Sequence, residues 1–301
     1  MAAGIQKSWI IDQESSQQTV KDFLQQKQGF SRRLLTSIKQ DGGSMMINND
    51  FCYVSNILET GDQLTVIFPD EVQSSSITAT EMNLDIVYED EDHLVLNKPA
   101  GQASMPSMTD RVDTLANGIA WYYQQENHPA TVHIVTRLDA NTSGLVLVAK
   151  NRYVHSLLAE NQKRNGIHRM YEALVTGVVE PEEGTISAPI SRKTTSIIER
   201  EVNWTTGKRA VTYYKTIATF SNASLLRIQL ETGRTHQIRV HFSHIGHPLL
   251  GDDLYGGEKS FIPRQALHCA YIEWEHPFLK RRIKLTCERP EDIMACMKAL
   301  C

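Results

Sequence analysis

The chain has 301 residues, of which 41% are hydrophobic and 22% are charged, and its formal net charge is −4. This composition is typical of folded globular proteins and excludes wholly disordered and fibrous classes. The chain as a whole lacks a basic excess, so any contact with nucleic acid must come from local patches. At roughly 150 residues per domain, one large domain or two unequal ones are expected.

No apolar run approaches the roughly 18 residues of a membrane helix, and the first residues do not resemble a signal peptide. We therefore expect a cytoplasmic protein that does not enter a membrane. The five cysteines have no CxxC spacing and are odd in number, which argues against a disulfide framework and against a cysteine-type zinc site. They are Cys52, Cys269, Cys287, Cys296 and Cys301.

The first part of the chain predicts an N-terminal extension, 1–16, followed by a small domain over 17–70. In that domain Val20, Phe23 and Leu24 recur at helical spacing, and a second helical segment ends at a pair of glycines. The pattern predicts two short helices that lead into a hairpin.

The polar, serine-rich stretch over 71–83 predicts a linker, and a second domain over 84–301 follows. Helix-like segments over 112–125 and 151–164 alternate with a larger number of strand-like segments, without strict βαβ order. This pattern predicts an α+β domain with a mixed, mostly antiparallel central sheet flanked by helices.

The stretch TRLDANTSG places Asp139 before an apolar run that is typical of a strand. Asp, Asn, Thr, Ser and Gly all favour tight turns, so the residue types alone favour a structural turn over a reactive carboxylate. Tyr171, at the head of a strand-like segment, is in the same way typical of a half-buried strand tyrosine.

The stretch LETGRTHQIRVHFSHIGHPLLGDDLYGG predicts a helix capped by Thr235, with Ile238 and Phe242 on one apolar face. Arg234 would lie at the entrance of this helix, where the helix dipole disfavours a cation. Its position therefore suggests a carboxylate or phosphate partner.

Four histidines in this stretch invite a metal hypothesis, but the HExxH pattern of zinc hydrolases is absent. They are His236, His241, His244 and His247. No GxGxxG or GxxxxGK[ST] motif occurs either. We therefore expect no metal, no nucleotide and no other cofactor.

Taken together and in order, six stretches resemble the RluA-type family of RNA pseudouridine synthases. The RLDxxTSG and GRTHQIRxH blocks are highly specific to that family, and the six stretches cover most of 84–278. They are VYEDEDHLVLNKPAGQASMP, RLDANTSGLVLVAKN, RMYEALVTG, GKRAVTYYK, LETGRTHQIRVHFSHIGHPLLGDDLYG and RQALHCAYIEWEHP.

The resemblance implies a pseudouridine synthase fold and a redox-neutral isomerisation that needs no cofactor. It implies that Asp139 is the catalytic aspartate, that Tyr171 packs on the target uracil, and that Arg234 pairs with the aspartate carboxylate. It further implies that Arg137 fills the space left by the flipped base and that Ile238 lines the pocket.

The small domain over 17–70 resembles an S4 RNA-binding domain, and this resemblance is less specific. It makes Arg32, Arg33 and Lys39, on or beside its second helix, candidates for phosphate contacts. One position departs from the synthase pattern, because Thr136 stands where many members have a histidine before the Arg-Leu-Asp.

The resemblance implies an RNA substrate, either ribosomal RNA of the large subunit or transfer RNA, and the S4-like domain favours ribosomal RNA. Nothing in the sequence suggests an obligate complex, so we expect a monomer. Two alternatives stay open: a non-catalytic RNA-binding or ribosome-assembly protein on the same fold, and a hydrolase with an aspartyl nucleophile.

Overall fold

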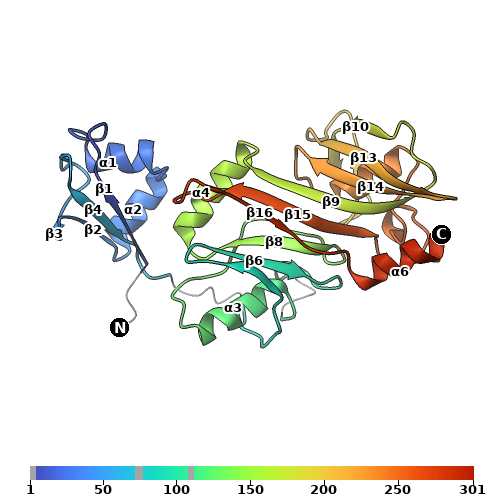
Figure 1. Ribbon diagram of the computed structural model, residues 1–301, viewed down its shortest axis with the longest axis horizontal. Coiled ribbons are helices and arrows are strands. Elements are labelled where there is room, and N and C mark those ends of the chain that lie inside the picture. The colour runs from blue at the N-terminus through green and yellow to red at the C-terminus, as the bar shows by residue number, and fades with distance from the viewer. Residues whose placement is uncertain (1–4, 72–76, 108–111) are drawn as a thin grey trace.

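The computed structural model describes residues 5–71, 77–107 and 112–301, which form two domains (Figure 1). The N-terminal domain lies at one end of the long axis, next to helix α4. Helix α6 and the C-terminus lie at the other end. Among the described residues, no helix combines the length and apolar character needed to span a bilayer.

The N-terminal domain packs two helical segments against a four-stranded antiparallel sheet with strand order β1-β4-β2-β3. Its elements are β1 Gln6–Ile10, α1 Val20–Asp22, the π-helical turn η1 Phe23–Lys27, α2 Arg32–Gln40, β2 Ser44–Ile47, β3 Asp50–Phe51 and β4 Gln63–Ile67. Ser31 caps α2, since its hydroxyl accepts a hydrogen bond from the Leu34 N–H. The predicted helices and hairpin of this domain are present.

The predicted N-terminal extension is wrong, because β1 is an edge strand of the domain's own sheet and pairs with β4 along its whole length. Apolar residues around β1 explain this. Trp9 packs edge-on against Phe23 and Phe30, and Ile11 is 1% exposed in the domain core. Burial of Trp9 and Ile11 stabilises this strand. The polar residues between and around them obscured it in the sequence.

The C-terminal domain is built on a ten-stranded sheet, in which eight strands follow the order β10-β13-β14-β9-β15-β8-β6-β5. The other two strands lie off this path: β16 pairs with β15, and β7 pairs with β8. Strands β11 and β12 form a separate two-stranded sheet. Its strands are β5 Ile86–Glu89, β6 His93–Lys98, β7 His133–Ile134, β8 Ser143–Ala149, β9 Ile167–Thr176, β10 Glu183–Ser187, β11 Ile190–Arg192, β12 Arg200–Val202, β13 Val211–Phe220, β14 Ala223–Leu230, β15 Leu267–Glu275 and β16 Arg282–Thr286. Its helices are α3 Leu115–Gln125, α4 Arg152–Lys163, α5 Gln237–His244, the 3₁₀ turn η2 Asp253–Tyr255 and α6 Glu291–Leu300. Only β8 and β15 pair in parallel in this sheet, so the prediction of a mixed, mostly antiparallel sheet is confirmed.

Strand β8 forms the centre of this domain, and all seven of its residues are buried. It pairs with β6, β7 and β15. The approach to β15 requires Gly144, whose φ is +113° and where a Cβ would lie 2.3 Å from the Cys269 carbonyl oxygen. The loop that precedes β8 is therefore fixed at one end to the most buried strand of the protein.

The two domains share an aromatic contact formed by Tyr153 of α4, which is 1% exposed. Its ring lies 4.3 Å from that of Phe30 and 4.9 Å from that of Phe68, centroid to centroid, and its hydroxyl donates to the Gln28 carbonyl at 3.0 Å. The side chain thus belongs to the core of the N-terminal domain although it comes from the other domain.

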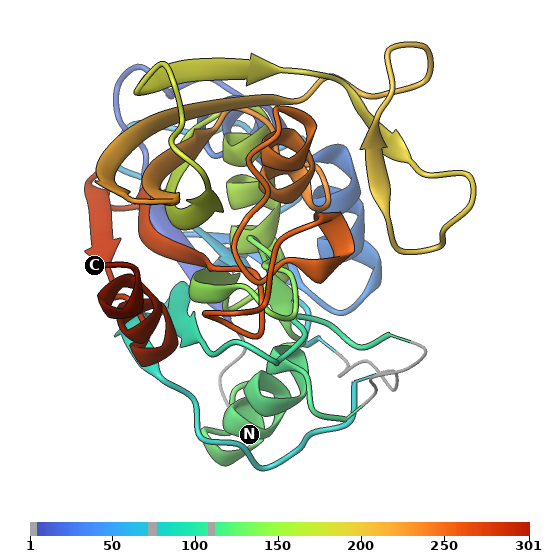
Figure 2. The ribbon, with the colours of Figure 1, turned by 90° about the vertical axis from the view of Figure 1, so that its right-hand side faces the viewer.

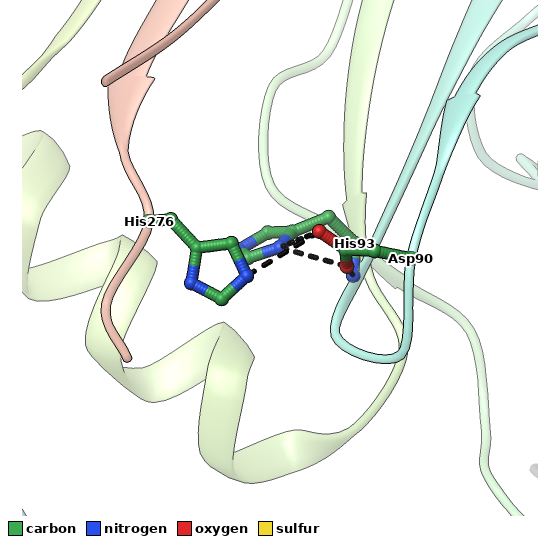
Figure 3. A group of neighbouring side chains, drawn as sticks. All are labelled: Asp90, His93 and His276. Atoms are coloured by element: carbon green, nitrogen blue, oxygen red, sulfur yellow. Dashed lines mark hydrogen bonds and ion pairs between the residues drawn. The ribbon is translucent and has the colours of Figure 1, made fainter. Parts of the chain in front are cut away.

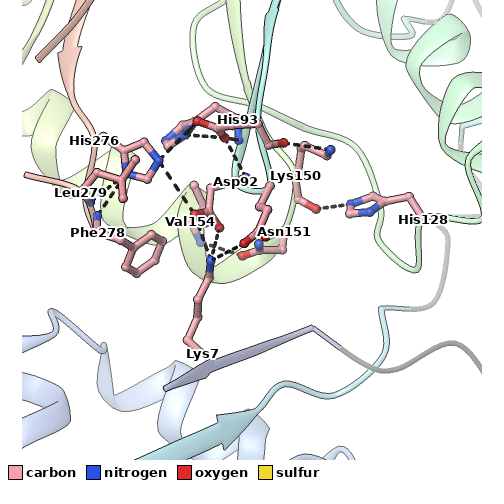
Figure 4. Close-up of polar contacts among 12 residues, drawn as sticks. Lys7, Asp92, His93, His128, Lys150, Asn151, Val154, His276, Phe278 and Leu279 are labelled. Atoms are coloured by element: carbon pink, nitrogen blue, oxygen red, sulfur yellow. Dashed lines mark hydrogen bonds and ion pairs between the residues drawn. The ribbon is translucent and has the colours of Figure 1, made fainter. Parts of the chain in front are cut away.

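A buried ion pair adds to this contact, because Lys7 of β1 lies 2.8 Å from the Asp92 carboxylate (Figure 4). Residues 72–76 of the predicted linker lie outside the described residues, and 77–83 contain no helix or strand. At its start, Glu71 accepts hydrogen bonds from the His133 ring and the Arg152 N–H, both at 2.6 Å. The N-terminal end of the linker is therefore attached to the C-terminal domain.

Candidate active site

A pocket of about 680 Å³ opens between the loop before β8, strand β9 and the start of α5. The five residues that the family resemblance singled out in the C-terminal domain all line it. They are Arg137, Asp139, Tyr171, Arg234 and Ile238. They come from three separate segments, so the fold brings them together although the sequence spreads them over about a hundred positions.

The loop that carries Asp139 is held on both sides of the aspartate. The Ser104 hydroxyl donates to the Leu138 carbonyl at 2.7 Å, and the Lys98 ammonium donates to the Ala140 carbonyl at 2.9 Å. The Thr142 N–H closes the turn by donating to the carbonyl of Asp139 itself at 3.0 Å. The backbone that presents the carboxylate is thereby fixed by contacts from distant segments.

Lys98 is completely buried and connects this loop to the chain that follows β6. Its ammonium also donates to the carbonyls of Pro99 and Gln102, both at 2.7 Å. Burial lowers the pKa of Lys98 to about 7. Three carbonyls match the three N–H bonds of an ammonium, so the protonated form anchors the loop best.

Thr136, the position that departs from the family pattern, is also structural. It is 1% exposed, and its hydroxyl accepts a hydrogen bond from the Leu147 N–H at 2.9 Å. Its own N–H donates to the Leu147 carbonyl. The side chain therefore binds the loop to β8 and faces the protein interior.

The Asp139 carboxylate faces a cation and an imidazole. Its Oδ2 lies 3.4 Å from the Arg239 guanidinium and 3.8 Å from the His236 Nε2. Arg239 is itself held by the fully buried Asp252 through two hydrogen bonds of 2.7 Å. This bidentate pair fixes the guanidinium and keeps one of its N–H groups available for Asp139.

The predicted ion pair between Arg234 and Asp139 is wrong, since Arg239 occupies that place. Arg234 is exposed at the rim of the pocket, where its side chain donates to the Arg209 carbonyl at 3.0 Å. The helix starts later than predicted, at Gln237, and its N-cap is His236 in a left-handed conformation, not Thr235. The cation in the first turn that needs a carboxylate partner is Arg239.

His236 completes the site through a partner that the sequence analysis missed. Its Nδ1 lies 2.8 Å from the hydroxyl of Tyr255, which also accepts a hydrogen bond from the Arg200 N–H at 2.9 Å. Burial lowers the pKa of His236. Asp252 and Tyr255 both belong to the GDDLYGG stretch. In the sequence, the closeness of this stretch to the helix was the signal that could have indicated their part in the site.

The lining of the pocket is rich in cations in a chain whose net charge is negative. Among the described residues that line it, four are arginines and one, Asp139, carries a carboxylate; the arginines are Arg137, Arg169, Arg234 and Arg239. The Arg169 guanidinium lies over the ring of Tyr171, 5.8 Å from its centroid. A positive pocket attracts the phosphates of a polyanion.

The four histidines weighed as metal ligands do not form a cluster. His241 uses both ring nitrogens within the protein, since Nδ1 lies 2.9 Å from the Thr212 hydroxyl and Nε2 lies 2.9 Å from the Ala188 carbonyl. The His247 Nδ1 lies 2.8 Å from the Thr176 carbonyl oxygen. Among the described residues, none of these four histidines belongs to a group whose ligand atoms lie close enough together for a metal ion.

A different group, Asp90, His93 and His276, has its ligand atoms close enough for a metal ion (Figure 3). It lies at the domain contact (Figure 4). The His276 Nδ1 accepts the N–H groups of Phe278 and Leu279, both at 3.2 Å. The neutral ring must then carry its proton on Nε2, which faces the Asp90 carboxylate at 3.3 Å. No lone pair of His276 is left for a metal, so hydrogen bonding explains the group.

Residues 92–244 match the family model described as RNA pseudouridylate synthase. The chain is 45% identical over 280 residues to the "Uncharacterized RNA pseudouridine synthase YjbO" of Bacillus subtilis (strain 168), which covers 93% of the chain and 98% of the relative. It is 36% identical over 272 residues to the ribosomal large subunit pseudouridine synthase D of Pseudomonas aeruginosa, with 86% and 84% covered. The chain belongs to the RNA pseudouridine synthase family.

Solved structures agree with this assignment. The synthase matches the human RNA pseudouridylate synthase domain containing 1 at 27% identity and a TM-score of 0.59, with 71% of the chain and 87% of that structure covered. The human domain containing 4, at 22% identity and a TM-score of 0.58, shares the fold. The prediction of an RluA-type synthase and of its fold is confirmed, and the enzyme isomerises uridine in RNA to pseudouridine.

Proposed function

We propose that Asp139 is the catalytic carboxylate of this synthase. The observation that carries the proposal is that, among the lining residues that the structure describes, only Asp139 supplies a carboxylate, and it stands among cations. Its loop is fixed on both sides, and its Oδ2 faces Arg239 at 3.4 Å. The guanidinium is therefore placed to pair with the negative charge of the carboxylate when a substrate excludes water.

The isomerisation breaks the N1–C1′ bond of the uridine and forms a C5–C1′ bond, while the proton of C5 is lost and N1 gains one. The reaction is redox-neutral. Asp139 either adds to C1′ or removes a proton from C2′ to give a glycal, and both roles require the ionised form. The remaining residues must bind the base and keep water away.

The uridine must leave the base stack before Asp139 reaches its ribose, which costs a few kcal/mol. Contact of the uracil with Tyr171 and Ile238, which are each 4% exposed in the pocket wall, offsets part of this cost. Arg137 is exposed at the pocket and is placed to fill the space that the base leaves. Arg234 at the rim then serves phosphate binding.

Ribosomal RNA of the large subunit is the proposed substrate, since one relative is named for that activity. The N-terminal domain supports this choice as an S4-like RNA-binding unit. Its α2 presents Arg32, Arg33 and Lys39 to solvent, where they can contact phosphates. A cytoplasmic monomer is part of the same proposal.

The test of the catalytic role is tritium release from RNA that contains 5-tritiated uridine. Asp139→Asn and Asp139→Ala should abolish release while RNA binding persists. Asp85→Asn, at an exposed aspartate outside the pocket, is the matched control and should retain wild-type activity. Wild-type release by Asp139→Asn would refute the assignment.

A second experiment identifies the substrate. Pseudouridines are mapped by carbodiimide modification and primer extension in RNA from a deletion strain, and the purified enzyme is then added back. Restoration of a missing site in large-subunit ribosomal RNA supports the proposal. Restoration only in transfer RNA would show that the proposed substrate is wrong.

A further inference from the structure

Tyr255 connects the candidate active site to a distant part of the fold. Strand β12, whose Arg200 N–H donates to the Tyr255 hydroxyl at 2.9 Å, belongs to a two-stranded ribbon that projects from the body of the domain (Figure 2, yellow, right). The ring of Tyr255 lies under the Arg239 guanidinium, 4.9 Å from its centroid. The tyrosine thus contacts both groups that face Asp139, Arg239 by its ring and His236 by its hydroxyl.

The contacts of Tyr255 bear on the protonation of His236. The Tyr255 hydroxyl accepts the Arg200 N–H, and its oxygen lies 2.8 Å from the His236 Nδ1, so its own hydrogen can be donated to that nitrogen. A hydroxyl that donates to Nδ1 requires a lone pair there, so the neutral ring must carry its proton on Nε2. This is the nitrogen that lies 3.8 Å from the Asp139 Oδ2.

The charges around the ring agree with a neutral donor. His236 faces the carboxylates of Asp139 and Asp252 and the guanidinium groups of Arg239 and Arg200, and burial is the largest influence, lowering its pKa. A neutral ring with its proton on Nε2 directs that N–H toward the Asp139 Oδ2, 3.8 Å from Nε2. Arg239 and His236 then both face Oδ2, and neither of these described contacts involves Oδ1.

We propose that Tyr255 is a positioning residue that holds His236 in the Nε2–H tautomer, so that His236 and Arg239 together fix Oδ2 of Asp139 and leave Oδ1 for the uridine. This proposal rests on the catalytic role of Asp139. The Tyr255 hydroxyl, the His236 ring and the Asp139 carboxylate then form one chain of polar contacts. A competing structural role for Tyr255 would be only to hold the β11–β12 ribbon through Arg200.

The test compares Tyr255→Phe in two backgrounds by the single-turnover rate of tritium release at saturating enzyme. In the wild-type background we expect a loss of about tenfold, the effect of one hydrogen bond of about 1.4 kcal/mol. His236→Gln keeps an N–H near the position of Nε2 and no longer depends on a tautomer. In that background Tyr255→Phe should have no further effect, since the two changes act through one chain.

Selective ¹⁵N-histidine spectra of the free enzyme give a readout that does not use activity. His236, assigned by its loss in His236→Gln, should show a non-protonated Nδ1 in the wild type and a protonated Nδ1 fraction in Tyr255→Phe. Tyr213→Phe is the matched control, because it removes a surface hydroxyl that donates to Glu231, and it should change neither rate nor tautomer.

Three results would overturn the proposal: an equal rate loss from Tyr255→Phe in both backgrounds, wild-type rates for both single variants, or a wild-type His236 with Nδ1–H. Each of these differs from failure of the catalytic assignment, which shows itself as an active Asp139→Asn. A folding defect in Tyr255→Phe would lower its melting temperature and would leave the tautomer of the folded wild type as the deciding measurement.

Discussion

Two arginines five positions apart in one motif have different environments. Arg239 is buried and holds Asp252 and Asp139, whereas Arg234 is exposed and bound to a backbone carbonyl. The cation at the start of this helix does face a carboxylate, as predicted from the helix dipole. That cation is Arg239 and not Arg234, because the helix begins at Gln237.

This difference in burial predicts that the same substitution, arginine to glutamine, lowers stability strongly at one position and hardly at the other. Arg239→Gln leaves Asp252 as an unpaired buried charge and should lower the free energy of unfolding by about 3–5 kcal/mol, with loss of tritium release. Arg234→Gln should change that free energy by less than about 0.5 kcal/mol and weaken RNA binding. Urea unfolding of both variants is the measurement, and equal stabilities would contradict the assignment.

His241 makes the stability of the protein depend on pH. Its ring is completely buried between Thr212 and Ala188, and burial lowers its pKa. In the unfolded chain histidine takes up a proton near pH 6.5. Between that pH and the lower folded pKa, unfolding binds a proton, so stability falls as the pH falls.

His241→Gln should therefore reduce the loss of unfolding free energy between pH 6.5 and 5.5 by up to about 1 kcal/mol. Urea unfolding at pH 7.5, 6.5 and 5.5 gives the slope. His244→Gln, at an exposed position of the same helix, is the matched control. An unchanged slope in His241→Gln would show that another group carries the pH dependence.

At the scale of elements, the site depends on how one loop is attached to its neighbours. Lys98, at the end of β6, and Ser104, shortly after it, hold this loop. They donate to the carbonyls of Ala140 and Leu138, on either side of Asp139. The NKPAG stretch thus contributes a buried anchor. The Lys98 ammonium makes the three hydrogen bonds of this anchor.

Lys98→Met keeps the stem and removes the three N–H donors. At least one buried carbonyl then lacks a partner, so the free energy of unfolding should fall by about 1–3 kcal/mol or more, and kcat should fall more than KM rises because the loop bearing Asp139 loosens. Lys298→Met, on the exposed side of α6, should change neither. A stable and fully active Lys98→Met would show that the loop is held by other contacts.

At the scale of the whole molecule, Tyr153 packs the C-terminal domain into the core of the N-terminal domain. Its ring belongs to the core of the N-terminal domain, and the Lys7–Asp92 ion pair lies beside it. Heat should therefore unfold the wild type in one transition. The N-terminal domain, with its exposed Arg32, Arg33 and Lys39, then keeps a defined position relative to the pocket.

Tyr153→Ala should uncouple the domains and produce two transitions in calorimetry, with the first at a lower temperature. The expected cost is about 3–5 kcal/mol, typical of removing a buried aromatic ring. Tyr153→Phe keeps the ring and loses only the bond to Gln28, so it should cost about 0.5–1.5 kcal/mol and retain a single transition. Two transitions in the wild type would contradict this account.

The sequence by itself determined the family, the α+β class with its mostly antiparallel sheet, and five of the residues that meet in the pocket. It could do so because alternation, turn residues and ordered motifs are local patterns. It also placed Asp139 in a turn, and the structure shows this turn as a loop fixed by Ser104 and Lys98.

Only the tertiary structure decided which side chains pair. Asp139 and Arg239 lie 100 positions apart, and the choice between Arg234 and Arg239 depended on where one helix starts and which face it turns to the loop. The buried place of Thr136 and the pairing of β1 with β4 depended on strand register in the same way. Contacts between distant segments follow from how helices and strands are packed, which spacing along the chain does not encode.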